Sequence, residues 1–249
     1  MDGERMLSTM QKFFTVLGGM GSLATESYVR LLNKRTPTKK DQDYLDYIVV
    51  NHATIPDRST YILDHNAEDP TPSLVEDIKQ QSLLKPAFFV LICNSAHYFY
   101  DDMQKATDIP ILHMPKIAIE EIKHIKPTAK RVGLIGTPGT IKVGIYNKFI
   151  EENGYELIKP TQEIIEATED LIFNDIKKKG QVDAAKYHAL LQQMIEQQKC
   201  DIVVLGCTEL SLAQEQAPDH NYPIVDAQSI IVDKSIKMGL ALRQTTIDN

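Results

Sequence analysis

The stretch Phe88-Phe89-Val90-Leu91-Ile92-Cys93-Asn94-Ser95-Ala96-His97 decides the fold, because five apolar residues run directly into a cysteine and then into small polar residues. A short, continuous apolar run of this kind is typical of a buried parallel strand. The sequence therefore predicts a strand that presents the Cys93 thiol at its carboxyl end. Ligands of open α/β sheets bind just beyond such strand ends, where the N-terminus of the next helix can lower the pKa of a thiol.

A second stretch repeats this arrangement. Asp201-Ile202-Val203-Val204-Leu205-Gly206-Cys207-Thr208-Glu209-Leu210 again places a cysteine at the end of an apolar run, with a small polar residue after it. The sequence thus presents two thiols in the same way. Glu209 has two interpretations: an acidic residue in the first turn of a helix, where the helix dipole stabilises it, or a hydrogen-bonding group of the site.

Three pairs of landmarks recur at nearly constant spacing along the chain. Gly18 precedes Gly136 by 118 positions, Cys93 precedes Cys207 by 114, and the strand at Pro110 precedes the strand at Pro223 by 113. Such agreement predicts two related α/β halves of about 110 residues each. We expect residues 1–115 with the closing helix 227–249 to form one domain and residues 116–226 the other. A pseudo-two-fold axis would place the two thiols opposite each other across the cleft between the halves.

The local patterns of the chain predict alternating strands and helices, with parallel sheets. Residues 1–12 are expected to form a frayed or partly helical lead-in. The expected strands are 13–17, 44–51, 88–93, 109–114, 130–135, 202–207 and 222–226. The expected helices are 23–34, 74–84, 98–106, 141–153, 163–179, 183–199 and 227–243.

Composition limits the classes of partner and the compartment. The formal net charge of −7 over 249 residues argues against a protein that coats nucleic acid or an anionic membrane. Three cysteines at these spacings do not indicate a disulfide framework, which favours a reducing cytoplasm. The sequence has no secretion-signal pattern and no apolar run of membrane-spanning length, so we expect a soluble cytoplasmic protein.

Two converging thiols favour one kind of chemistry. If Cys93 and Cys207 face the same carbon, one removes a proton as a thiolate while the other returns a proton to the opposite face, which inverts a stereocentre. Asn94, Ser95 and Thr208 can donate hydrogen bonds to a carboxylate on that carbon and stabilise the charge that develops when the proton leaves.

Other roles remain open for individual residues. A single cysteine can be a core residue, a nucleophile or a metal ligand; Cys93, His97 and Cys207 could bind a metal, but no C-x-x-C motif or second nearby histidine completes a shell. His97 is expected to be an orienting residue at a helix end, and Cys200 to serve packing only. Arg58 is either a solvated loop residue or a residue whose guanidinium binds a substrate carboxylate through two N–H groups.

The two cysteine motifs, together with Leu17-Gly18-Gly19-Met20-Gly21, resemble those of the aspartate/glutamate racemase family over nearly the whole chain. The resemblance is greater to aspartate racemases, because glutamate racemases usually begin with an Asp-Ser-Gly motif and place a histidine where this chain has Glu209. It implies two Rossmann-like halves with the active site between them, a homodimer, and neither pyridoxal phosphate nor a metal.

The resemblance also implies roles for residues that match the family's positions. Cys93 and Cys207 correspond to the acid/base thiols. The positions around the α-carboxylate and amino group are matched by Asn94, Ser95, Thr137, Thr140 and Thr208. Arg58 and Lys177 match the cations that hold the side-chain carboxylate, although Lys177 alone reads as part of a solvated lysine run. Met20 and Glu209 are expected at the same substrate site.

The sequence thus predicts a cofactor-independent racemase that interconverts L- and D-aspartate, with a small dicarboxylic amino acid as its partner. The nearest alternatives are a glutamate racemase, a broad-specificity amino-acid racemase or another isomerase of the same scaffold. A two-lobed protein that binds an acidic amino acid without turning it over is the alternative from another class, although two thiols at strand ends exceed what binding requires.

Overall fold

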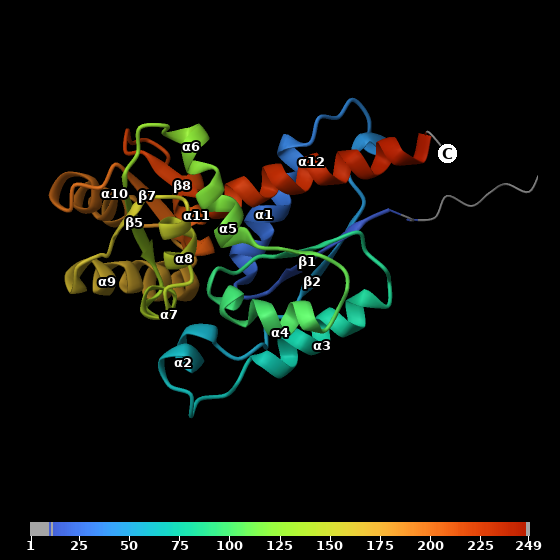
Figure 1. Ribbon diagram of the computed structural model, residues 1–249, viewed down its shortest axis with the longest axis horizontal. Coiled ribbons are helices and arrows are strands. Elements are labelled where there is room, and N and C mark those ends of the chain that lie inside the picture. The colour runs from blue at the N-terminus through green and yellow to red at the C-terminus, as the bar shows by residue number, and fades with distance from the viewer. Residues whose placement is uncertain (1–9, 11, 248–249) are drawn as a thin grey trace, which may run out of the picture.

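The computed structural model of the protein describes residue 10 and residues 12–247. The lead-in expected over residues 1–12 therefore falls almost wholly outside the described residues. The rest of the chain alternates strands and helices and builds two sheets, which Figure 1 shows with the first half of the chain in blue to green and the second in yellow to orange.

The first sheet has four parallel strands in the order β2-β1-β3-β4. They are β1 (Phe14–Gly18), β2 (Tyr47–Asn51), β3 (Phe89–Leu91) and β4 (Ile111–Leu112). Val16 of β1 pairs with Val49 on one side and Val90 on the other. Both β1 and β3 are buried along their whole length, as expected for parallel strands covered on both faces.

The second sheet repeats this topology with the order β6-β5-β7-β8. Its strands are β5 (Arg131–Gly136), β6 (Glu156–Ile158), β7 (Ile202–Gly206) and β8 (Ile224–Asp226), all parallel. Strand for strand, β5 corresponds to β1, β7 to β3 and β8 to β4, at the spacings found in the sequence. The prediction of an α/β fold with two similar halves is confirmed. Where the chain divides into domains stays a prediction.

Helices connect the strands and cover the sheets. In the first half they are α1 (Ser22–Arg35), α2 (Arg58–Leu63), α3 (Thr71–Ser82), α4 (Tyr100–Lys105), α5 (Met114–Glu120) and α6 (Ile122–Ile125). In the second half they are α7 (Pro138–Val143), α8 (Asn147–Glu152), α9 (Gln162–Glu169), α10 (Ala184–Gln192), α11 (Thr208–Gln216) and α12 (Ala227–Ile247). Two 3-10 turns (Asp41–Asp43 and Ser95–Phe99) and two π-helical segments (Asp170–Lys177 and Gln193–Gln197) complete the elements.

Several elements differ from the expectation. The helix expected over 141–153 is two helices, because Gly144 adopts a left-handed conformation with φ 67° that ends α7. The edge strand β6 was not expected, since three residues give too short a pattern. Helices α5 and α6 were also not expected, α11 was foreseen only as one interpretation of Glu209, and Arg58, placed in an irregular segment, begins α2.

One apolar core runs beneath both sheets. A single cluster of buried side chains joins Phe14 and Val90 of the first sheet to Val132 and Val204 of the second, and includes Ile231 of α12. Helix α12 packs against α1 and α5 and also contacts α11 (Figure 1). No helix in the described part of the chain is long and apolar enough to cross a membrane.

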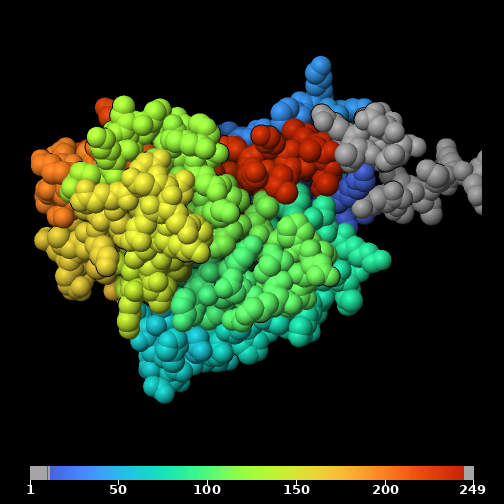
Figure 2. All heavy atoms as spheres, in the orientation of Figure 1, coloured from blue at the N-terminus to red at the C-terminus, as the bar shows by residue number. Residues whose placement is uncertain are grey.

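A second contact between the halves lies at α2 and α7. A side-chain carbon at Gly139 would stand 2.9 Å from Cα of Ser59, so only glycine allows the two helices to approach this closely. Figure 2 shows the same contact at the surface, where the yellow second half meets the cyan segment that contains α2. The carboxyl ends of the two sheets are thereby held next to each other.

Candidate active site

The loop after β1 has a backbone that only glycine can form. Gly19 has φ 90°, and a side-chain carbon there would stand 2.5 Å from the backbone of His52. The hydroxyl of Thr25 accepts a hydrogen bond from the Gly19 N–H at 3.0 Å and donates one to the Gly21 carbonyl at 2.8 Å. This loop carries Met20 into the site.

Cys93 follows β3 and is buried, with 4% of its surface exposed. Its Sγ lies 3.4 Å from the hydroxyl of Ser95, a neutral partner. Asn94 and Ser95 are buried beside it at the start of the 3-10 turn, which packs against α7 of the other half. The end of β3 thus lies next to the second half; whether the two thiols face each other stays a prediction.

His97 fixes the backbone of Cys93. Its Nδ1 lies 2.8 Å from the Cys93 carbonyl oxygen, and its Nε2 accepts a hydrogen bond from the Met114 N–H at 3.1 Å. Complete burial, followed by the nearby His113, lowers the pKa of His97 to about 3. The ring is therefore neutral with its proton on Nδ1, and it links the end of β3 to the start of α5.

Cys207 follows β7 and has a charged partner. Its thiol donates a hydrogen bond of 2.8 Å to Oε2 of Glu209, which also accepts one from the Thr208 hydroxyl at 3.3 Å. Burial raises the pKa of Cys207 well above its usual range, the Glu209 carboxylate raises it further, and Lys177 acts in the opposite direction. Cys207 is therefore a protonated thiol in the absence of substrate. Glu209 combines both sequence interpretations, since it lies in the first turn of α11 and hydrogen-bonds in the site.

Lys177 is distinct from the other lysines of its run. It lies at the end of a π-helical segment, a feature frequent at functional sites, and its Nζ is 3.8 Å from Oε1 of Glu209. Lys179 instead pairs with Asp175 at 2.7 Å. Burial opposes the charge of Lys177, but Glu209, Cys207, Cys93 and Asp57 together raise its pKa.

Arg58 is buried, with 6% of its surface exposed, rather than solvated. Its guanidinium donates to the carbonyl oxygens of Ile55 (3.0 Å), Pro56 (2.9 Å) and Met20 (2.9 Å). Its Nε is buried without a hydrogen-bond partner, and among the described residues no carboxylate lies within ion-pair distance of it. A buried cation paired only with carbonyl groups is suited to an anionic ligand.

The threonines after β5 lie at the contact between the halves. Thr137 caps α7, and its hydroxyl lies 3.0 Å from that of Thr140. Ser59 of α2 donates to the Thr137 hydroxyl at 2.8 Å. Thr137 and Thr140 are therefore buried next to α2 of the first half. The sequence did not predict this helix.

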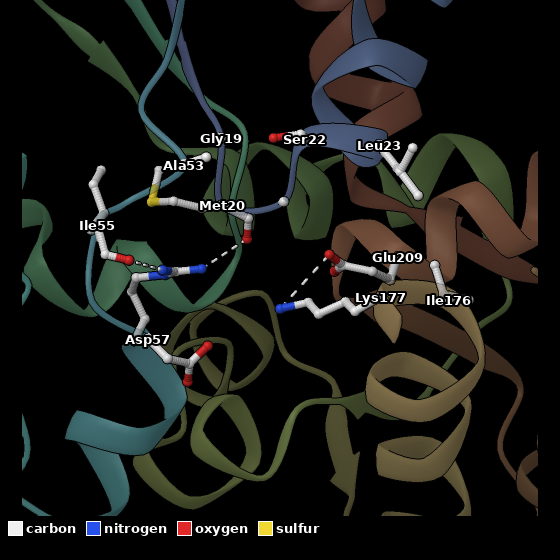
Figure 3. Close-up of a pocket in the computed structure, with 12 residues that line it drawn as sticks. Gly19, Met20, Ser22, Leu23, Ala53, Ile55, Asp57, Ile176, Lys177 and Glu209 are labelled. Atoms are coloured by element: carbon white, nitrogen blue, oxygen red, sulfur yellow. Dashed lines mark hydrogen bonds and ion pairs between the residues drawn. The ribbon is translucent and has the colours of Figure 1, made fainter. Parts of the chain in front are cut away.

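A cavity of about 460 Å³ opens at the carboxyl ends of the strands. Figure 3 shows Met20, Ile55 and Asp57 of the first half on one side of it and Lys177 and Glu209 of the second half on the other. The two cysteines are not in the wall of this cavity, and both are buried. In the described part of the chain, no group of three or more His, Cys, Asp and Glu side chains could hold a metal ion.

Two residues of the site were missed by the sequence reasoning. Asp57 lines the cavity and caps α2 by accepting from the Thr60 N–H at 2.8 Å; burial opposes its charge, but this bond and the charges of Arg58 and Lys177 lower its pKa overall. The Asp-x-x-Thr pattern of a helix start could have indicated the cap. Tyr146 donates a hydrogen bond to Asn94 across the two halves, and nothing in the local sequence signals it.

Fold and site together define a two-half α/β protein with a thiol at the equivalent strand end of each half. The model of the Asp/Glu/hydantoin racemase family matches residues 17–234, and the chain belongs to that family.

Individual relatives are similar along most of their length. The chain is 25% identical over 232 residues to the broad specificity amino-acid racemase RacX of Bacillus subtilis, covering 91% of this chain and 97% of that protein. It is 31% identical over 216 residues to the glutamate racemase of Shewanella pealeana, covering 78% and 71%. The aspartate racemase of Picrophilus torridus has the same fold, with a TM-score of 0.75 at 24% identity, covering 92% of this chain and 94% of that one.

Proposed function

We propose that the protein is a cofactor-independent amino-acid racemase that interconverts L- and D-aspartate, with Cys93 and Cys207 as its acid/base groups. The observation that carries this proposal is the placement of the two thiols. They follow corresponding strands, β3 and β7, of two sheets with the same strand order, and both are buried. Thiols at equivalent strand ends of two related halves can approach one carbon from opposite faces, as two-base proton transfer needs.

These positions determine which group removes a proton and which group donates one during the reaction. One cysteine, as a thiolate, removes the α-proton, while the other, as a thiol, gives its proton to the opposite face of the same carbon. Cys207 holds its proton before substrate binds, because burial and Glu209 disfavour its thiolate. It therefore starts as the acid in one direction of the reaction and becomes the base in the other. The two sulfurs exchange roles in each turnover.

An acidic substrate is supported by the two cations of the site. Arg58 is buried without a carboxylate partner, and Lys177 extends into the cavity from the opposite half (Figure 3). A side-chain carboxylate placed between them gains two charge-assisted hydrogen bonds. The hydroxyls of Ser95, Thr137 and Thr208, which lie against Cys93, Thr140 and Glu209 in the free protein, are the groups proposed to bind the substituents of the α-carbon.

A broad-specificity racemase is the second candidate, and the cavity favours it. Its volume of about 460 Å³ is in the range of sites for much larger ligands, and its wall contains Asp57 and Glu209 as well as the two cations. The carboxylates of Asp57 and Glu209 can form hydrogen bonds or ion pairs with substrate side chains that carry no carboxylate. The family relative RacX is itself described as a broad specificity amino-acid racemase.

Deuterium exchange tests the proposal. The protein is incubated with L-aspartate in deuterated water without added cofactor, and chirality and α-deuterium are measured in each enantiomer. Two-thiol catalysis predicts that the first D-aspartate formed carries deuterium while the remaining L-aspartate is still largely protonated. L-glutamate, L-alanine and L-lysine are assayed alongside, and faster turnover of any of them favours the second candidate. Absence of exchange with every amino acid contradicts racemase activity.

A further inference from the structure

Tyr146 connects the two cysteine motifs. It lies between α7 and α8 in the second half and is completely buried. Its hydroxyl donates a hydrogen bond to Oδ1 of Asn94, the residue that follows Cys93. On the other side, its ring lies close enough to Gly206 that a side-chain carbon there would stand 3.5 Å from Cε2. Gly206 directly precedes Cys207, so one side chain bonds to the neighbour of one thiol and lies near the neighbour of the other.

The hydrogen bond determines which way the Asn94 amide points. Because the amide oxygen accepts from Tyr146, the amide nitrogen is directed elsewhere, and it is buried without a hydrogen-bond partner. A buried N–H₂ group without a partner costs free energy unless a ligand supplies an acceptor. With the amide reversed, an oxygen would occupy that place and repel a carboxylate.

The electrostatics of the site keep Tyr146 a donor. Burial, and then Asp226 and Cys207, raise the pKa of Tyr146 well above its usual range, so the hydroxyl keeps its proton at neutral pH. A deprotonated phenol would accept from the amide nitrogen and reverse the group.

We propose that Tyr146 is a positioning residue of the racemase site: its hydroxyl holds the Asn94 amide with the nitrogen free to donate to the substrate carboxylate. This inference depends on the proposed racemase function. According to this inference, Tyr146 of the second half orients Asn94, a substrate-binding residue of the first half.

The experiment compares kcat and KM of the wild type, Tyr146→Phe, Asn94→Ala and the double variant. Phenylalanine keeps the ring against Gly206 and removes only the hydroxyl, so KM is expected to rise about tenfold with little change in kcat. In the Asn94→Ala background the same substitution should leave KM unchanged, because its target is gone. Tyr28→Phe is the matched control: Tyr28 is also completely buried, and its hydroxyl donates to Ser235 at 2.8 Å.

Two outcomes overturn the inference: an unchanged KM in Tyr146→Phe, or an equal rise in KM with and without the Asn94 side chain. A rise in KM of similar size in Tyr28→Phe also overturns it, because the effect would then reflect loss of any buried hydroxyl. If the wild type turns over no amino acid, the proposed function fails separately. The same four proteins are then compared by urea unfolding, where additive losses of stability overturn the link and non-additive losses support it.

Discussion

The two halves share a topology but surround their thiols differently. Cys93 lies 3.4 Å from the neutral hydroxyl of Ser95, whereas Cys207 donates to the carboxylate of Glu209 at 2.8 Å. The residue four positions after each cysteine differs as well. His97 contacts the start of α5, while Ser211 donates to Asp226, which caps α12, at 2.6 Å. A repeated backbone thus presents two thiols in different surroundings.

The largest expected effect comes from removing either thiol. Cys93→Ala and Cys207→Ala should each reduce racemisation by at least about a thousandfold, since one-sided proton transfer cannot invert the centre. Chiral chromatography measures the rate, and circular dichroism verifies the fold. Cys200→Ala is the matched control, because Cys200 is equally buried but lies before β7, at the opposite end from Cys207. Racemisation at the wild-type rate in either active-site variant would show that the halves do not act as a pair.

A smaller effect is expected from making the two thiols more alike. Glu209→Gln keeps an acceptor for the Cys207 thiol but removes the negative charge that raises its pKa, so that pKa should fall. Activity that requires the protonated thiol is then lost at lower pH, and the alkaline limb of the kcat/KM profile should move down by about one unit. Glu215→Gln is the control, since this carboxylate of the same helix pairs with Arg30 at the surface. An unmoved alkaline limb would mean that it does not report Cys207.

The smallest effect is on stability and concerns His97, whose counterpart in the second half, Ser211, does not titrate. The pKa of His97 is about 3 in the folded protein against about 6.5 when unfolded, so its contribution is fully present above pH 6.5 and is lost as pH falls toward 3. His97→Gln, which cannot titrate, should reduce the fall in unfolding free energy by up to about 1.4 kcal/mol per pH unit over that window. Urea denaturation at pH 7, 6 and 5 measures this slope. The same slope in variant and wild type would contradict a neutral buried ring.

Much of the fold could be predicted because its signals are local. The apolar runs before Cys93 and Cys207 predict β3 and β7, and their spacing predicts the repeat. The edge strand β6 could not be predicted in this way, since three partly exposed residues carry little pattern. The break at Gly144 was missed because a glycine within a helical pattern is often tolerated.

The site was predictable only as far as its residues lie at strand ends. The sequence placed the cysteines and their polar neighbours there, and the structure brings Met20, Arg58, Lys177 and Glu209 around one cavity. It could not show that Arg58 is held by three carbonyl groups, nor that Tyr146 reaches Asn94, because those contacts join segments far apart in the chain. Contacts between the halves depend on tertiary packing, which no local pattern encodes.

The core shared by the two sheets limits how such a protein can be cut or recombined. Val90 of one sheet and Val204 of the other belong to a single packed cluster, together with Ile231 of α12. Exchanging one half for that of a relative would leave an apolar surface fitted to a different neighbour, and a fragment ending near residue 115 would expose that surface to water. The shared core therefore makes the stability of each half depend on the other.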